Sequence, residues 1–293
     1  MYTDISKIKQ TDISIPKGSS FYLLKDGRLC IYTYISLHIY NMITFKTDLI
    51  LDEKTFPSEN NDGFGNWGEL VCLTELKNGF LILGFGRAYN FTNLIIDITN
   101  NNPRIIDKFQ IANEDYCCRE IMNFEMGDKE YFIAGDYHPE IYNVEKPFNK
   151  ITFLDIFLEQ MIQIKDTNLL GYIEQKKLNI LDLKEVEKNK KGEKIICINF
   201  EKKEEEFIKM LQIKDEIVVL GKDTLLFINL KNYQNCSLVI NKEFYNINEL
   251  QSMCKLYNNQ LLTISSNGDL YKISVEKKEI LQKVTIDAQD DGY

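Results

Sequence analysis

Gln260-Leu-Leu-Thr-Ile-Ser-Ser-Asn-Gly-Asp-Leu-Tyr-Lys-Ile-Ser274 places two apolar runs on either side of the dipeptide Asn267-Gly268. Asn-Gly between alternating runs is the strongest short-range signal for a β-hairpin, because both central residues of a type I′ turn need a positive φ. The second run stops at a small polar residue, Ser274. This stretch therefore predicts two antiparallel strands and a defined end to the second one.

A short apolar run that stops at Asn, Asp or Ser occurs six times along the chain, at intervals of 39 to 56 residues. The six stops are Asn41, Asp97, Asn143, Asp182, Asn229 and Ser274. Asn and Asp side chains bond the backbone about two residues further on, and so they start a turn where a strand ends. Each stop is therefore expected to close the third strand of a repeat.

Each repeat carries two more apolar runs, one before its hairpin and one after its stop. The runs that follow the stops lie at 45–51, 104–109, 150–153, 195–200, 237–240 and 280–286. Four short strands in about 40–50 residues are typical of a β-propeller with one blade per repeat. We predict an all-β fold, a β-propeller of six four-stranded antiparallel blades. The alternative, seven blades, would need strands from 52–68 and from the N-terminal residues.

The repeat resembles that of WD40-type propellers, whose blades often end the third strand in Trp-Asp. Here Tyr, Ile or Leu stands where Trp would be, and the Gly-His pair usual near the start of such a repeat is missing. The resemblance covers residues 17–287, which we expect to form a single propeller domain. Residues 1–16 are then an N-terminal extension or a strand that closes the ring, and 288–293 form an acidic tail.

Composition excludes some partners. The formal net charge is −9, from 35 Lys and Arg against 44 Asp and Glu, so nucleic acid is not expected as a partner, because binding to its phosphates depends on clustered cations. No apolar stretch approaches the roughly 20 residues of a membrane span, and the N-terminus lacks the apolar core of a signal peptide.

The seven cysteines are scattered, and none forms a Cys-x-x-Cys spacing. Several fall in expected strands, where a free Cys behaves as a small apolar residue. Reduced thiols are typical of a reducing compartment. We expect a cytoplasmic protein, with the nucleus as the alternative.

The resemblance also implies where a partner would bind. In WD40-type propellers, the loops between blades and the turns between second and third strands form the rim on which partners usually dock. The residues of this chain at those positions are Trp67, Glu69, Arg87, Tyr89, Asp115, Tyr116, Arg119, Asp136, Tyr137 and His138. Tyr, Trp and Arg are the residues that most often anchor interfaces. Packing or local ion pairing is the alternative role for these residues.

Catalytic interpretations have less support in the sequence. Cys117-Cys118 with His138 suggests a thiol nucleophile and its base, but a vicinal Cys pair in a strand is more often packing. Asp136, Asp115 and Glu69 would serve a hydrolase or sugar-binding propeller with an acidic, Ca²⁺-dependent centre, although no motif singles them out. We expect no cofactor and no metal. The favoured hypothesis is a non-catalytic scaffold that binds a protein or peptide and is itself a monomeric subunit of a larger assembly.

Overall fold

The computed structural model describes most of the chain between residues 20 and 285. The described residues are 20–41, 44, 46–52, 54–55, 69–86, 93–99, 102–111, 118–135, 138–145, 148–154, 156, 160–164, 167–174, 177–183, 193–199, 207–221, 225–229, 239–240, 250–256, 259–265 and 268–285. For 193–199, 207–208, 239–240 and 251 only the backbone is described.

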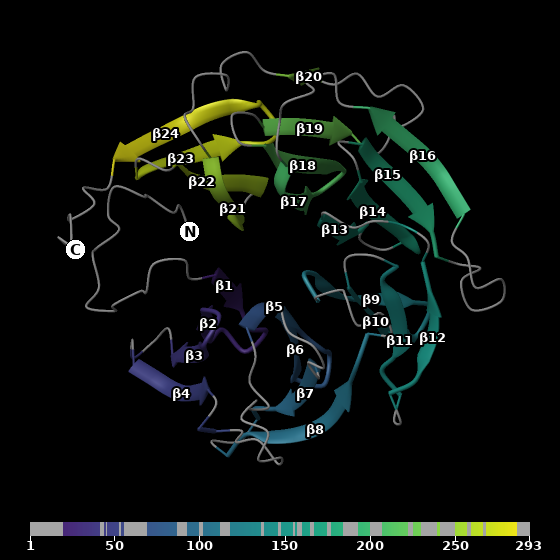
Figure 1. The fold of residues 1–293 in the computed structure, drawn as a ribbon. Coiled ribbons are helices and arrows are strands. Elements are labelled where there is room, and N and C mark those ends of the chain that lie inside the picture. Colours follow the sequence, from purple (N-terminus) through teal and green to yellow (C-terminus); the bar gives the residue numbers. More distant parts are fainter. Residues whose placement is uncertain are drawn as a thin grey trace. The chain divides into compact units, whose positions relative to one another are not determined.

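Six antiparallel sheets of four strands each make up the fold, and in every sheet the strands follow one another in chain order (Figure 1). The strands of the first three sheets are β1 (Ser20–Leu23), β2 (Leu29–Tyr32), β3 (Ser36–Asn41), β4 (Lys46–Asp52), β5 (Glu69–Glu75), β6 (Phe80–Gly86), β7 (Asn93–Asp97), β8 (Arg104–Phe109), β9 (Ile121–Met126), β10 (Lys129–Ala134), β11 (Glu140–Asn143) and β12 (Lys150–Phe153). Those of the last three are β13 (Gln160–Gln163), β14 (Leu169–Glu174), β15 (Lys177–Asp182), β16 (Glu193–Asn199), β17 (Phe207–Ile213), β18 (Glu216–Gly221), β19 (Leu225–Asn229), β20 (Val239–Ile240), β21 (Leu250–Leu256), β22 (Gln260–Ser265), β23 (Asp269–Ser274) and β24 (Glu279–Thr285).

The sheets are the blades of a six-bladed β-propeller, which confirms the predicted fold class. The part of the chain that the structure describes contains six such sheets and no seventh. It also contains no helix with the length and hydrophobicity that a membrane span requires. The chain divides into two compact units, which we call the first unit (blades one to three, β1–β12) and the second unit (blades four to six, β13–β24).

All six predicted stops are the last residues of third strands, β3, β7, β11, β15, β19 and β23. The predicted mechanism is visible in the side chains. Asp97 Oδ1 accepts the N–H of Thr99 at 2.9 Å, and Asn143 Oδ1 accepts the N–H of Glu145 at 2.8 Å. Each acceptor occupies an amide that the strand ladder no longer pairs, so the stop residue ends its strand by starting a turn.

Boundaries of the outer strands differ from the predictions by one or two residues. β16 begins at Glu193 rather than at 195, and β24 begins at Glu279 rather than at 280. Outer strands pair on one side only, so the apolar pattern constrains their ends less tightly than those of the inner strands.

Apolar clusters lie between neighbouring blades of each unit. Leu37 and Ile39 of the first blade share a cluster with Leu81 and Leu83 of the second, and all four are fully buried. Corresponding clusters join the second blade to the third, the fourth to the fifth and the fifth to the sixth. This explains the almost continuous apolar runs of the inner strands, because both faces of these strands are covered.

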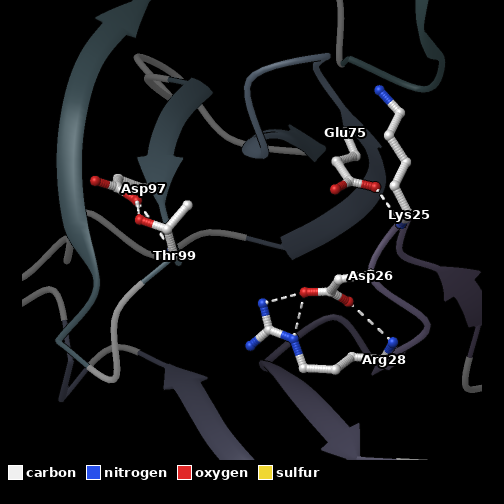
Figure 2. A network of polar contacts seen from close by, with 6 residues as sticks. All are labelled: Lys25, Asp26, Arg28, Glu75, Asp97 and Thr99. Carbon is white, nitrogen blue, oxygen red and sulfur yellow. Dashed lines mark hydrogen bonds and ion pairs between the residues drawn. The ribbon is translucent and has the colours of Figure 1, made fainter.

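Carboxylates complement this packing in the first unit, at the turns between first and second strands. Glu75, at the end of β5, accepts the backbone N–H of Lys25 from the first blade at 2.7 Å (Figure 2), and the Tyr22 hydroxyl accepts the N–H of Glu75 at 3.2 Å. In the next blade, Glu130 accepts the N–H of Lys77 at 2.9 Å. A glutamate thus satisfies a turn amide of the preceding blade at two successive junctions.

Asp97 anchors the turn between β7 and β8 through three hydrogen bonds (Figure 2 shows its contact with Thr99). The Thr99 hydroxyl donates to it at 2.5 Å, and the Arg104 guanidinium donates at 2.8 Å. The hydrogen bonds from Thr99 and the Arg104 cation lower the pKa of Asp97 to about 2. The carboxylate is 6% exposed, so its charge depends on these partners.

The blade assignment predicts that an aspartate destabilises the protein much more at Ile96 than at Ile50. Ile96→Asp replaces a fully buried side chain of β7, and we expect it to lose roughly 1.5–3 kcal/mol of apolar burial and to add the cost of an unpaired buried charge. Ile50→Asp, at a position in β4 that is 47% exposed, is the matched control and should shift the melting temperature little. Equal denaturation midpoints for the two variants would contradict the assignment.

Asp97 predicts a stability difference that depends on pH. A carboxyl whose pKa is lowered in the folded state stabilises the protein above its unfolded pKa of 3.8, and that stability is lost as pH falls toward 2. Asp97→Asn should therefore destabilise the protein at neutral pH by at most about 2 kcal/mol, because solvent screens the exposed Arg104, and its melting temperature should converge with that of the parent between pH 4 and pH 2. Asp48→Asn, at an exposed position of β4, is the control. A difference in melting temperature between Asp97→Asn and the parent that stays constant from pH 4 to pH 2 would refute the role assigned to Asp97.

Candidate functional site

The described residues among those predicted to bind a partner lie at the same end of their blades. In a sheet whose strands follow chain order, the first and third turns lie at one end, and the second turn and the segment leading into the first strand lie at the other. Three of the predicted residues are described: Glu69, Arg119 and His138, all in the first unit and all exposed. The other seven lie outside the described residues: Trp67, Arg87, Tyr89, Asp115, Tyr116, Asp136 and Tyr137.

Glu69 begins β5 and lies beside the second turn of the first blade. The N–H of the next residue, Leu70, donates to the Tyr34 carbonyl at 2.9 Å, so strand and turn are joined by their backbones. The turn is closed by a hydrogen bond from the Thr33 N–H to the Ser36 carbonyl at 2.9 Å. At its tip, Tyr34 is 63% exposed and Ile35 is 77% exposed. Two large side chains are therefore presented to solvent next to a carboxylate.

Arg119 belongs to the segment that leads into β9. The N–H of Cys118 donates to the Phe85 carbonyl at the end of β6 at 3.2 Å, and the carbonyl of Glu120 accepts the N–H of Gly135 at 3.0 Å. These two bonds hold the segment between the second and third blades on either side of the exposed arginine. Its position is therefore set by the backbone.

His138 lies in the second turn of the third blade and has a positive φ of 49°. Its N–H donates to the Ile156 carbonyl at 3.1 Å, which ties the turn to the segment after β12. Its ring is perpendicular to that of Phe153, at the end of β12, with centroids 6.1 Å apart. Phe153 is 55% exposed. We call Tyr34, Ile35, Glu69, Arg119, His138 and Phe153 the candidate face.

A buried polar cluster supports this end of the third blade. Glu140, 3% exposed at the start of β11, accepts a short hydrogen bond from the Tyr142 hydroxyl and another from Lys150 Nζ at 3.0 Å. Burial and the neighbouring carboxylate raise the pKa of Tyr142. A tyrosine with a raised pKa keeps its proton and remains a hydrogen-bond donor to Glu140, the first residue of the strand that follows the turn carrying His138.

The sixth blade, in the second unit, contains the same arrangement. Asp269 begins β23 and accepts hydrogen bonds from Tyr271 at 3.1 Å and Thr285 at 2.6 Å, and it pairs with Lys283 at 2.8 Å. Lys283 and Thr285 lower the pKa of Asp269. An acid, a tyrosine two residues later and a lysine from the fourth strand thus recur in two blades, as expected for a structural device of the repeat.

The thiol and acidic alternatives can be placed in part. Cys118 is 1% exposed and lies in the apolar cluster between the second and third blades, beside Cys72, whereas His138 is exposed. Cys117 lies outside the described residues, as do Asp115 and Asp136. Among the residues that the structure describes, no three His, Cys, Asp or Glu side chains are grouped to hold a metal ion.

Sequence reasoning missed three members of the candidate face, Tyr34, Ile35 and Phe153. The signal for the first two was present, because Tyr34-Ile35 interrupts a turn where Gly, Asn, Asp or Ser is usual. Phe153 carries no such signal. An apolar residue at the end of a strand is expected to lie in the core, and only the folded structure shows that the Phe153 side chain is exposed.

Comparison with known proteins supports the fold only. No family model matches the sequence, and no curated protein does either. Among solved structures, Hsv2 of Kluyvelomyces marxianus is similar over 92% of this chain and 81% of its own, with 12% identity and a TM-score of 0.61. The computationally designed protein Ika8 is similar over 89% of this chain and 72% of its own, with 12% identity and a TM-score of 0.57.

Proposed function

We propose that this protein is a non-catalytic scaffold that binds a protein or peptide partner at the candidate face. The observation that carries the proposal is the exposed pair Tyr34 and Ile35, at 63% and 77%, on a turn that hydrogen bonds fix to the next blade. A large apolar residue at a turn tip has no folding benefit there, whereas a partner would bury it. Tyrosine is also among the side chains most enriched at interface anchors.

The chemistry of the face suits a polypeptide. Aromatic and aliphatic side chains from the first and third blades share this face with a carboxylate, Glu69, and a guanidinium, Arg119. Apolar anchors with a polar, charged rim are the usual anatomy of a protein interface. The net charge of −9 disfavours a nucleic acid.

The resemblance of the repeats to the WD40 type supports the same end of the blades as the docking rim. Under this proposal the face extends to the seven predicted residues outside the described part of the chain, among them Trp67, Arg87 and Tyr89. The protein would act within the cytoplasm as one subunit of a larger assembly, and residues 17–287 would fold as a single propeller domain.

Removal of the two exposed turn side chains should abolish partner binding without loss of stability. We expect Tyr34→Ala with Ile35→Ser to reduce recovery of the partner at least tenfold in a quantitative affinity purification. Its melting temperature should stay within a few degrees of the parent, since both side chains are mostly exposed. Phe153→Ala should act in the same direction.

Leu281→Ala is the matched control, because Leu281 is a 42% exposed apolar residue on β24 of the second unit. It should leave partner recovery unchanged. A second set, Trp67→Ala, Arg87→Ala and Tyr89→Ala, tests the extension of the face. If every partner is retained by both the turn variant and this set, the proposed face is wrong.

A further inference from the structure

Two buried cysteines from different blades lie side by side in the first unit. Cys72 is in β5 of the second blade, and Cys118 lies in the segment before β9 of the third blade. They are 8% and 1% exposed, and their sulfur atoms are 4.0 Å apart. Forty-six residues separate them in the sequence, so their approach is a product of the fold.

Gly84 provides the space in which the sulfurs meet. It pairs with Cys72 across β5 and β6. A Cβ at this position would lie 2.5 Å from Cys72 Sγ and 2.8 Å from Cys118 Sγ. Its φ is not in the left-handed region, so the backbone would accept any residue. Space, and not backbone conformation, therefore requires glycine here, and a larger residue would push the thiols apart.

Cys30 shows what an ordinary core thiol looks like in the same unit. It is fully buried between the first and second blades, and burial raises its pKa to about 12. Its role is explained by packing alone. Cys72 and Cys118 have in addition a thiol neighbour within reach, which a packing role does not need.

We propose that Cys72 and Cys118 are a redox couple, which a hydroperoxide converts into a disulfide that links the second blade to the third. The sulfurs must approach by about 2 Å, since a disulfide bond is about 2.05 Å long. Small side-chain rotations supply a movement of this size, without separation of the blades.

The reaction balances with one hydroperoxide. The thiolate of one cysteine attacks the peroxide, the O–O bond breaks, and a sulfenic acid forms with release of water or an alcohol after proton transfer. The second thiol then attacks the sulfenic sulfur, the S–S bond forms, and a second water leaves with its proton. Two electrons pass from the two sulfurs to the peroxide, and a thiol reductant reverses the change.

The surroundings of the pair make this oxidation slow and selective. The Cys72 thiol donates to the Cys118 carbonyl at 3.0 Å, and the Cys118 thiol donates to the Glu120 carbonyl at 3.7 Å. The reacting S–H must lose this proton, because the thiolate is the nucleophile. Because both thiols are buried, a small hydroperoxide reaches them more readily than a bulky disulfide reagent does. The couple therefore responds to sustained oxidation.

The test uses the full-length native protein and hydrogen peroxide. After treatment, free thiols are alkylated, the protein is digested without reduction, and peptides are sequenced by mass spectrometry. We expect a cross-linked pair that joins residue 72 to residue 118 with two hydrogen atoms fewer, lost on treatment with dithiothreitol. The melting temperature of the oxidised protein should rise by several degrees, because the link closes a long loop of the unfolded chain.

Matched variants separate this pair from the other thiols. Cys72→Ala and Cys118→Ala should lose both the link and the peroxide-induced rise in melting temperature, whereas Cys30→Ala, Cys117→Ala and Cys254→Ala should keep both. Gly84→Ala should lower the yield of the link. The parent protein gives the decisive mass readout even where a variant fails to fold.

Three results would overturn the proposal. In the first, Cys72 and Cys118 remain fully alkylatable while the exposed Cys254 is oxidised. In the second, the link runs through Cys117. In the third, the link forms equally well in denaturant, where the fold no longer brings the sulfurs together. Any one of these outcomes would mean that the two cysteines only pack in the core and do not form a redox couple.

Discussion

Apolar contact between the facing sheets of adjacent blades is the interaction on which the rest of this structure depends. A single four-stranded blade has two faces to cover and too little chain to cover them itself. The second blade solves this by packing one face on the first blade and the other on the third: Leu83 and Ile96 belong to one cluster, and Ile82 and Ile95 to the next. Each fully buried side chain of this kind contributes about 1.5–3 kcal/mol, which makes a central blade the least tolerant of polar substitution.

Packing alone does not fix the angle or register between blades, because apolar faces can slide. Directional contacts supply what is missing. Glu75 and Glu130 each accept a turn amide from the blade before, at 2.7 Å and 2.9 Å. At the other end of the strands, the N–H of Leu70 and that of Cys118 donate to carbonyls of the preceding blade. Each junction in the first unit thus has hydrogen bonds near both ends of its inner strands, and an apolar cluster packs the same two blades together.

Local chemistry explains why much of the fold was predictable from sequence. Asn143 stops its strand by accepting an amide two residues on, a contact that two neighbouring residues make by themselves. The pairing of Glu75 with Lys25 spans 50 residues and leaves no local pattern, so no inspection of either segment reveals it. The candidate face combines both situations. Glu69, Arg119 and His138 follow from their places in the repeat, while the exposure of Phe153 depends on where β12 ends relative to the turn before β11.

The repeated acid, tyrosine and lysine cluster shows how structure and function divide within one blade. At the start of the third strand in two different blades, a buried acid is held by a tyrosine and a lysine. The two sets are Glu140 with Tyr142 and Lys150, and Asp269 with Tyr271 and Lys283. A feature that the repeat copies is a requirement of the blade. The third blade differs from the sixth in the exposed ring pair His138 and Phe153, which lies at the same end of the blade as Glu140. Under the proposed function, recognition would depend on the residues that vary between equivalent turns, whereas the buried clusters belong to the blade itself.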